Sequence, residues 1–212
     1  VPTGNFGNVF ACYSAYKISM HLNKILVAVN DNNILHRFFS ENKKKKTKVS
    51  ETLSPSMDIS IASNFERLLY DFYADRDCSI CDDFYKNFPQ SPIKLEKSMW
   101  EKSKDLFMSY SVDDISTINA MKNIFASYDY LIDPHTAVAI EAVDKINEKL
   151  DGETLILSTA HPAKFPEIIE DANLELSDIP KTLSDVYNLD EKASHMPASK
   201  ELIFNFIIKN NL

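Results

Sequence analysis

The sequence predicts an α/β fold with buried, mostly parallel strands flanked by helices. The first observation is that residues 24–30 and 153–157 each contain a short, continuous apolar run, which is typical of strands buried on both faces of a parallel sheet. The second is that segments with apolar residues at helical spacing precede and separate these runs. The third is a length of 212 residues, enough to bury a core without disulfide or metal cross-links.

The first half of the chain begins with a helix after Asn8, where apolar residues recur at helical spacing. The strand at 24–30 follows. Residues 41–54 include four consecutive lysines and are followed by Ser-Pro-Ser, so we expect a flexible, solvated loop there. From Phe65, apolar residues repeat at i, i+3, i+4, i+7 and i+8, which predicts a helix packed on the core.

Further helices are expected at about 95–110 and at 112–128, the second with Ser111 as its N-cap. Asp133 followed by Pro134 predicts another helix start, because the carboxylate caps free N–H groups and proline is tolerated at the first position. We expect this helix to end near Leu150.

The last part of the chain is expected to begin with the strand at 153–157, after the break at Asp151 and Gly152. Short helices and a final amphipathic helix over about 199–209 should follow.

Composition excludes several classes of partner. The formal charge of −8 argues against binding to nucleic acid or to an anionic membrane. The longest aliphatic run, Ile25 to Val29, is far too short to span a bilayer. Three cysteines provide no dense disulfide framework, which favours a cytoplasmic protein. Because the chain opens at Val1, without a methionine and inside a glycine-containing motif, we interpret it as truncated at its N-terminus.

Two of the three glycines lie in the window Gly4-Asn5-Phe6-Gly7-Asn8. Glycine reaches positive φ without steric cost, so this window could turn several backbone N–H groups towards one point, just before a helix. Such a nest, with the positive end of the helix dipole, binds phosphate without a basic side chain. The alternative is a plain tight turn that caps the helix, and spacing alone leaves both open.

The second candidate segment, residues 158–165, directly follows the predicted strand 153–157. Ligands of open α/β sheets bind outside the carboxyl ends of the strands. The Thr159 hydroxyl could hydrogen-bond a ring nitrogen and leave the ring neutral, or it could cap the next turn. His161 and Lys164 could each contact an anion, or they could be ordinary polar loop residues.

Other motifs give weaker indications. Cys78 and Cys81 form a CxxC, but zinc requires four ligands and neither a second CxxC nor a nearby histidine pair accompanies them. The histidines lack metal-binding spacing, and the sequence contains no GxSxG nucleophile elbow. We therefore predict no metal site.

Four segments resemble threonine synthases, in the same order as in that family. The opening Val-Pro-Thr-Gly-Asn-Phe-Gly-Asn resembles the family's phosphate loop. The other three are Pro-Ser-Met-Asp-Ile (55–59) leading into Ser-Asn-Phe-Glu-Arg-Leu-Leu (63–69), Asp-Pro-His-Thr-Ala (133–137) and Ser-Thr-Ala-His-Pro-Ala-Lys-Phe (158–165). Together they extend over nearly the whole chain.

The resemblance implies that residues 1–212 are the C-terminal part of the large domain of a fold-type II enzyme that binds pyridoxal 5'-phosphate (PLP). It implies that Gly4, Asn5, Phe6, Gly7 and Asn8 bind the cofactor phosphate. It also places Thr159 at the pyridine nitrogen.

The implied reaction converts O-phosphohomoserine and water to L-threonine and phosphate. In the family the Schiff-base lysine lies in a segment like Phe-Lys-Asp, which this sequence lacks, so the lysine is expected upstream of Val1. Lys164 does not match it. No catalytic residue is therefore assigned in this chain, and we expect the chain alone to be inactive. Alternatives are another fold-type II lyase, such as threonine dehydratase or cysteine synthase, and a non-catalytic phosphate-binding module.

Overall fold

The computed structural model describes residues 1–73, 79–146, 152–176, 179–187 and 189–210. It divides into two compact units, Val1–Ser177 and Asp178–Leu212. In the first unit the elements are, in order, α1 (Gly7–Lys17), β1 (Ile25–Val29), α2 (Ile34–Glu41), η1 (Pro55–Met57), α3 (Phe65–Tyr73), α4 (Ser79–Asn87), α5 (Lys97–Ser103), β2 (Phe107–Ser111), α6 (Asp114–Tyr128), α7 (Pro134–Lys145), η2 (Pro162–Lys164) and α8 (Pro166–Asp171).

The two strands form a parallel pair, with Ile25 opposite Phe107 and Val29 opposite Ser111. On the other side of β1, the Thr3 N–H donates to the Ala28 carbonyl at 2.9 Å, next to the bridge between Pro2 and Ala28. The chain therefore runs parallel to β1 before it turns into α1. This pairing places the turn at the carboxyl end of β1.

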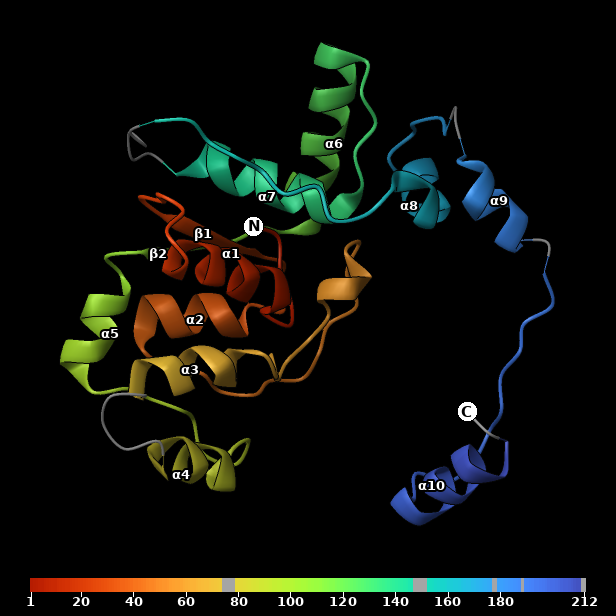
Figure 1. The fold of residues 1–212 in the computed structure, drawn as a ribbon. Coiled ribbons are helices and arrows are strands. Elements are labelled where there is room, and N and C mark those ends of the chain that lie inside the picture. Colours follow the sequence, from red (N-terminus) through yellow and green to blue (C-terminus); the bar gives the residue numbers. More distant parts are fainter. Residues whose placement is uncertain (74–78, 147–151, 177–178, 188, 211–212) are drawn as a thin grey trace. The chain divides into compact units, whose positions relative to one another are not determined.

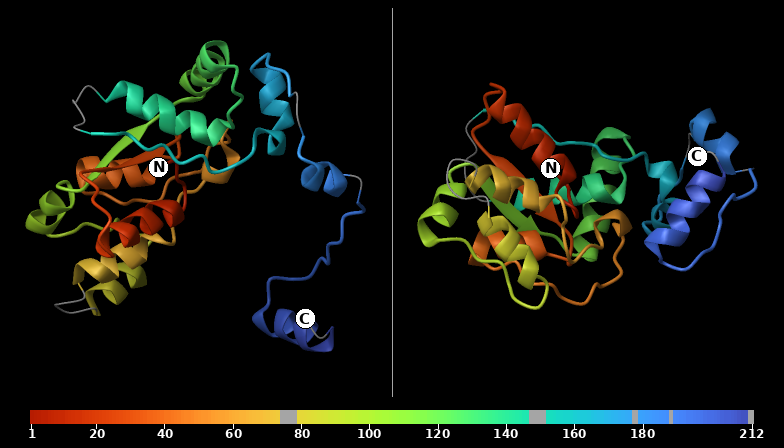
Figure 2. Two further views of the ribbon diagram at one scale, coloured as in Figure 1. Left: turned by 45° about the horizontal axis from the view of Figure 1, so that its top comes forward. Right: turned by 60° about the horizontal axis from the view of Figure 1, so that its bottom comes forward.

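Helices cover both faces of β1 (Figures 1 and 2). Ile25, Val27 and Val29 are buried in a cluster with side chains from α1, α2 and α3. Ala28 lies in a second cluster with three small or branched residues of α7, namely Val138, Ala139 and Ala142. This alternation follows from the two-residue period of a strand. The predictions of a buried strand at 24–30 and of an α/β fold with parallel strands flanked by helices are confirmed.

The helix predicted at 95–110 is wrong in its second half. Helix α5 ends at Ser103, and Phe107–Ser111 is strand β2. The Ile25 N–H donates to the Leu106 carbonyl at 2.8 Å at one end of the pair. Because pairing with a strand far earlier in the chain stabilises β2, apolar spacing inside the local window could not reveal it.

Helix starts were predicted more closely. Asp133 caps α7 by accepting from the N–H groups of His135 and Thr136, as predicted. The end expected near Leu150 lies outside the described residues, since α7 ends at Lys145. The N-cap of α6 is Asp113, whose carboxylate accepts from the Ser116 N–H at 2.7 Å. The expected cap, Ser111, is the last residue of β2, so that prediction was wrong by two residues.

The strand predicted at 153–157 is not formed in the described structure. These residues belong to no helix or strand, and the side chain of Leu155 is 73% exposed. A strand requires a backbone partner, and no described segment pairs with this one. Ile156 nevertheless packs against the cluster around Ala28 and α7.

The lysine run lies in a segment without helix or strand, but the interpretation of the whole run as solvated is wrong for Lys44. Its side chain is fully buried, and its backbone exchanges hydrogen bonds of 3.0 and 2.9 Å with Ile93. Its Nζ lies 4.1 Å from the centre of the Phe88 ring. The bridge to Ile93 holds Lys44 inside the fold. Flexibility of the rest of 41–54 stays a prediction.

The second unit contains α9 (Lys181–Tyr187) and α10 (Lys200–Lys209). Ser199 caps α10 by accepting from the Leu202 N–H at 3.4 Å, so the final helix predicted at 199–209 is confirmed. Among the described residues, no helix is long and apolar enough to cross a membrane.

Candidate functional site

A cavity of about 290 Å³ lies within the first unit, close to the lower end of the usual range for small-molecule sites. Its walls come from four segments that are distant in the sequence. The residues that line it are Pro2, Thr3, Gly4, Asn5, Gly7, Asn8, Ser56, Met57, His135, Thr159, Ala160, Lys164 and Phe165. The structure therefore brings Thr159 and the glycine window to one cavity, as the sequence predicts.

Gly4 is required for a reason other than the one predicted. Neither Gly4 nor Gly7 has a positive φ. A Cβ atom on Gly4 would lie 2.7 Å from the Met57 Cα and 3.0 Å from the Met57 carbonyl oxygen. On Gly7 the nearest atom, Asn64 Nδ2, would be at an ordinary 3.6 Å. Gly4 is therefore needed for close backbone approach, not for a left-handed conformation.

The residue with positive φ in the window is Phe6, at 66°. Its side chain is fully buried, and its ring centre lies 5.2 Å from that of Phe65 and 6.3 Å from that of Phe107. Its N–H donates to Thr3 Oγ1 at 3.0 Å. Phe6 is not among the residues that line the cavity, and its part in phosphate binding stays a prediction. It anchors the loop, and its packing offsets the backbone strain.

The N-terminus of α1 lies at the cavity. Gly7 and Asn8 are its first two residues, so their N–H groups precede the first intrahelical hydrogen bond. The N-cap position, Phe6, provides no side-chain cap. Asn5 ties the loop to the start of α3, because its Oδ1 accepts from the Ser63 N–H at 2.6 Å. This arrangement leaves the positive end of the helix available to an anion.

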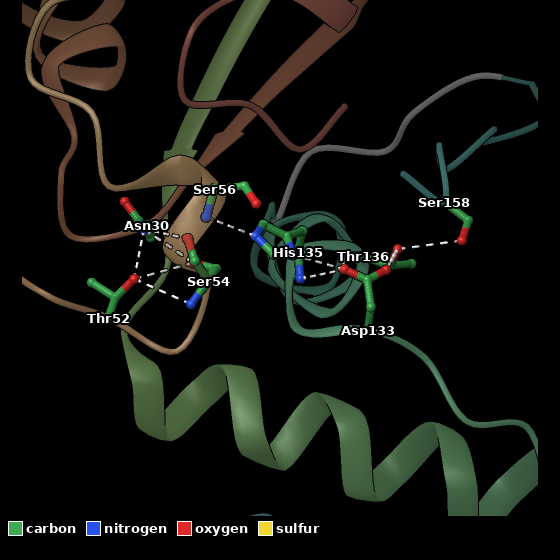
Figure 3. Close-up of polar contacts among 8 residues, drawn as sticks. All are labelled: Asn30, Thr52, Ser54, Ser56, Asp133, His135, Thr136 and Ser158. Atoms are coloured by element: carbon green, nitrogen blue, oxygen red, sulfur yellow. Dashed lines mark hydrogen bonds and ion pairs between the residues drawn. The ribbon is translucent and has the colours of Figure 1, made fainter. Parts of the chain in front are cut away.

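A buried polar cluster of Asp133, His135 and Thr136 lies at the start of α7 (Figure 3), and its member His135 lines the cavity. His135 Nδ1 lies 2.9 Å from Asp133 Oδ1, and His135 Nε2 accepts from the Ser56 N–H at 3.2 Å. The Thr136 hydroxyl donates to the other Asp133 oxygen. Burial alone would raise the pKa of Asp133, but the hydrogen bonds from His135 and Thr136 outweigh it and hold the pKa below its usual 3.8.

The segment after 153–157 contributes Thr159, Ala160, Lys164 and Phe165 to the cavity. The turn η2 is capped by His161, whose Nδ1 accepts from the Ala163 N–H at 3.1 Å. His161 does not line the cavity. The alternative role of Thr159 as a cap of the next turn is thus filled by His161.

Residues 136–207 match the model of the C-terminal region of threonine synthase. The threonine synthase of Pseudomonas aeruginosa is 36% identical over 200 residues, which is 93% of this chain and 42% of that protein. That of Saccharomyces cerevisiae is 34% identical over 232 residues, covering 98% and 45%.

Solved structures agree with these matches. The crystal structure of PLP-bound threonine synthase from Brucella melitensis has a TM-score of 0.85 and 28% identity, over 97% of this chain and 44% of that one. The yeast threonine synthase structure has a TM-score of 0.84 and 31% identity, over 99% and 46%. The chain belongs to the threonine synthase family. It spans less than half the length of these relatives.

The threonine synthase match at 136–207 covers only some of the residues that line the cavity. Thr159 and Lys164 lie within it, whereas the glycine window, Ser56 and His135 precede it. Sequence reasoning assigned no role to Ser56 or His135. Both stand in segments that resemble the family, 55–59 and 133–137, and this was the signal that could have identified them.

Among the described residues, no group of three His, Cys, Asp or Glu side chains is placed to bind a metal. Cys78 of the CxxC lies outside the described residues.

Proposed function

We propose that this chain is part of a threonine synthase, which converts O-phosphohomoserine and water to L-threonine and phosphate with PLP. The observation that carries the proposal is the single cavity lined by the glycine window and by Thr159. A PLP molecule whose phosphate lies at the glycine window and whose ring nitrogen lies at Thr159 requires that both line the same cavity. Similarity to threonine synthases over more than nine-tenths of the chain supports this reading over the other fold-type II lyases.

The residues around the cavity fit the phosphate of PLP. The uncapped N–H groups of Gly7 and Asn8 would donate to it, and the dipole of α1 would favour its negative charge. Gly4 and Asn5 shape this end of the cavity. Phe6 supports the loop from the core.

Thr159 would hold the pyridine nitrogen. A hydroxyl donates a hydrogen bond to a neutral ring nitrogen, whereas a carboxylate would stabilise the protonated ring. When bound, PLP supplies a sink for carbanion charge, and the protein supplies binding and orientation. Lys164 would place a positive charge beside an anionic group of the substrate or cofactor.

The acid–base group is proposed to lie in the part of the relatives that this chain does not span. General acid–base catalysis commonly contributes about 100- to 10,000-fold to a rate, so the chain alone should be inactive even if it binds PLP. We also propose that the protein works in a reducing cytoplasm, in keeping with its three cysteines.

PLP binding and activity test the proposal separately. PLP is titrated into the purified chain and into a Thr159→Val variant, and binding is followed by the absorbance of PLP. We expect weak binding that the variant weakens further. Phosphate release from O-phosphohomoserine is then measured for this chain and for one extended upstream through a Phe-Lys-Asp-like segment. Activity should appear only in the longer protein. Saturable PLP binding of the same affinity in the unmodified chain and in Thr159→Val would refute the assignment of Thr159 to the cofactor site.

A further inference from the structure

His135 contacts two of the segments that line the cavity: η1, through Ser56, and residues 158–165, through Phe165. These two segments are called the two walls below. His135 stands in the second position of α7, is only 3% exposed, and lines the cavity. We propose that His135 is a positioning residue that fixes the two walls relative to each other, as a neutral imidazole with its proton on Nδ1. The inference rests on the proposed function, because it assigns the walls to a PLP site.

The first wall is held through the backbone of η1. His135 Nε2 accepts the Ser56 N–H at 3.2 Å. The next residue, Met57, is the one whose backbone a Cβ atom on Gly4 would touch. A shift of Ser56 away from the imidazole would therefore move the surface against which the phosphate loop lies. A series of direct contacts through Ser56 and Met57 therefore connects the hydrogen bond of His135 to Gly4.

The second wall is held through the segment that carries Thr159. The His135 ring centre lies 4.7 Å from that of Phe165, at an interplanar angle of 49°. From the neighbouring position in α7, Thr136 Oγ1 lies 3.4 Å from Ser158 Oγ. These two contacts hold both ends of the 158–165 segment against the start of α7 (Figure 3 shows the second).

The hydrogen-bond partners determine the tautomer. A backbone N–H can only donate, so the Nε2 atom that faces Ser56 must be unprotonated. The proton then lies on Nδ1 and is donated to Asp133 Oδ1 at 2.9 Å. Asp133 is itself oriented by the N–H of His135 and by the hydroxyl of Thr136. The partner of one ring nitrogen thus determines whether the other nitrogen carries the proton.

Two substitutions distinguish the contribution of Nε2 from that of Nδ1. In His135→Gln the side-chain amide reaches the place of Nε2 and can accept from Ser56, whereas in His135→Asn it reaches only the place of Nδ1. His36→Gln is the matched control, because His36 is partly buried, lies in α2 outside the cavity lining, and bonds Ser109 Oγ at 3.0 Å. A general loss of histidine packing would affect all three variants.

The experiment combines a PLP titration with NMR of the unmodified chain and the three variants. Imidazole ¹⁵N and ¹³C shifts should report the Nδ1–H tautomer. His135→Asn should weaken PLP binding roughly tenfold, the factor for one lost hydrogen bond, and should shift the amide signals of Gly4, Ser56 and Ala160. His135→Gln should stay within about threefold of the unmodified chain, and His36→Gln should be unchanged.

Two results would overturn the inference: an Nε2–H tautomer, or equal PLP affinities and equal amide shifts for the Gln and Asn variants. If the Asn variant does not fold, the tautomer and the behaviour of the Gln variant decide. If the unmodified chain binds no PLP, the tautomer and the amide shifts of the two segments still judge the role of His135. The proposed function is then judged by phosphate release from the chain extended upstream.

Discussion

Replacement of Gly4 by alanine should destabilise the fold, whereas the same change at Gly7 should not. The added Cβ at Gly4 would lie 2.7 Å from the Met57 Cα, well inside the 3.5–4.0 Å optimum for carbon pairs. The Met57 Cα is backbone, and the residue is only 3% exposed, so no side-chain rotation relieves the contact. The loop at residues 4–8 or η1 must move by about 1 Å to restore that optimum.

The magnitude follows from these distances. Overpacking of this kind typically costs about 1–3 kcal/mol. At Gly7 the nearest atom is 3.6 Å away and φ is not positive, so alanine should gain about 0.4–1 kcal/mol by restricting the unfolded chain. The two variants should therefore differ by about 1.4–4 kcal/mol. With a urea m-value of about 2 kcal/mol/M, their midpoints should differ by about 0.7–2 M.

Urea unfolding followed by tryptophan fluorescence measures this difference. Trp100 is the single tryptophan of the sequence and lies in α5 of the first unit, where its Nε1–H donates to the Phe38 carbonyl at 2.9 Å. The signal therefore reports the unit that contains Gly4. Equal midpoints for Gly4→Ala and Gly7→Ala would refute the close approach to Met57 as the reason for glycine at this position.

Three further outcomes are expected from unfolding measurements. Lys44→Met should stabilise the fold at pH 7 by up to roughly 3 kcal/mol, since burial lowers the pKa of Lys44 from 10.5 to about 8. The gain should disappear above pH 10.5, where Lys44 is neutral in both states, and a less stable variant at pH 7 would show that contact with Phe88 outweighs desolvation. Asp133 should stabilise the fold above pH 3.8 and lose this contribution as the pH falls through its lowered folded-state pKa. The stability lost in Asp133→Asn at pH 6 should therefore shrink towards pH 3. A loss of stability that does not change with pH would contradict a stabilising role of the ionised carboxylate. Phe6→Ala should cost about 3–5 kcal/mol because the ring is fully buried, and a cost below about 1 kcal/mol would place the ring outside the core.

The sequence alone determined the features that depend on neighbouring residues. The helix from Phe65, the buried strand at 24–30 and the Asp133-Pro134 helix start were all predicted correctly, because periodicity and capping act within one or two turns. The glycine window before α1 and Thr159 were also identified from sequence as members of one site. Resemblance to threonine synthases supplied that link, and the shared cavity agrees with it.

Tertiary structure decided what depends on contacts between distant segments. β2 forms because its backbone pairs with β1, and 153–157 forms no strand because no described segment pairs with it. Gly4 is needed where Met57 approaches, and Phe6 points into the core because the rings packed there come from other elements. His135 joins the cavity only when α7 meets η1 and the segment containing Phe165. Such long-range contacts leave no local periodicity, so only the folded chain reveals them.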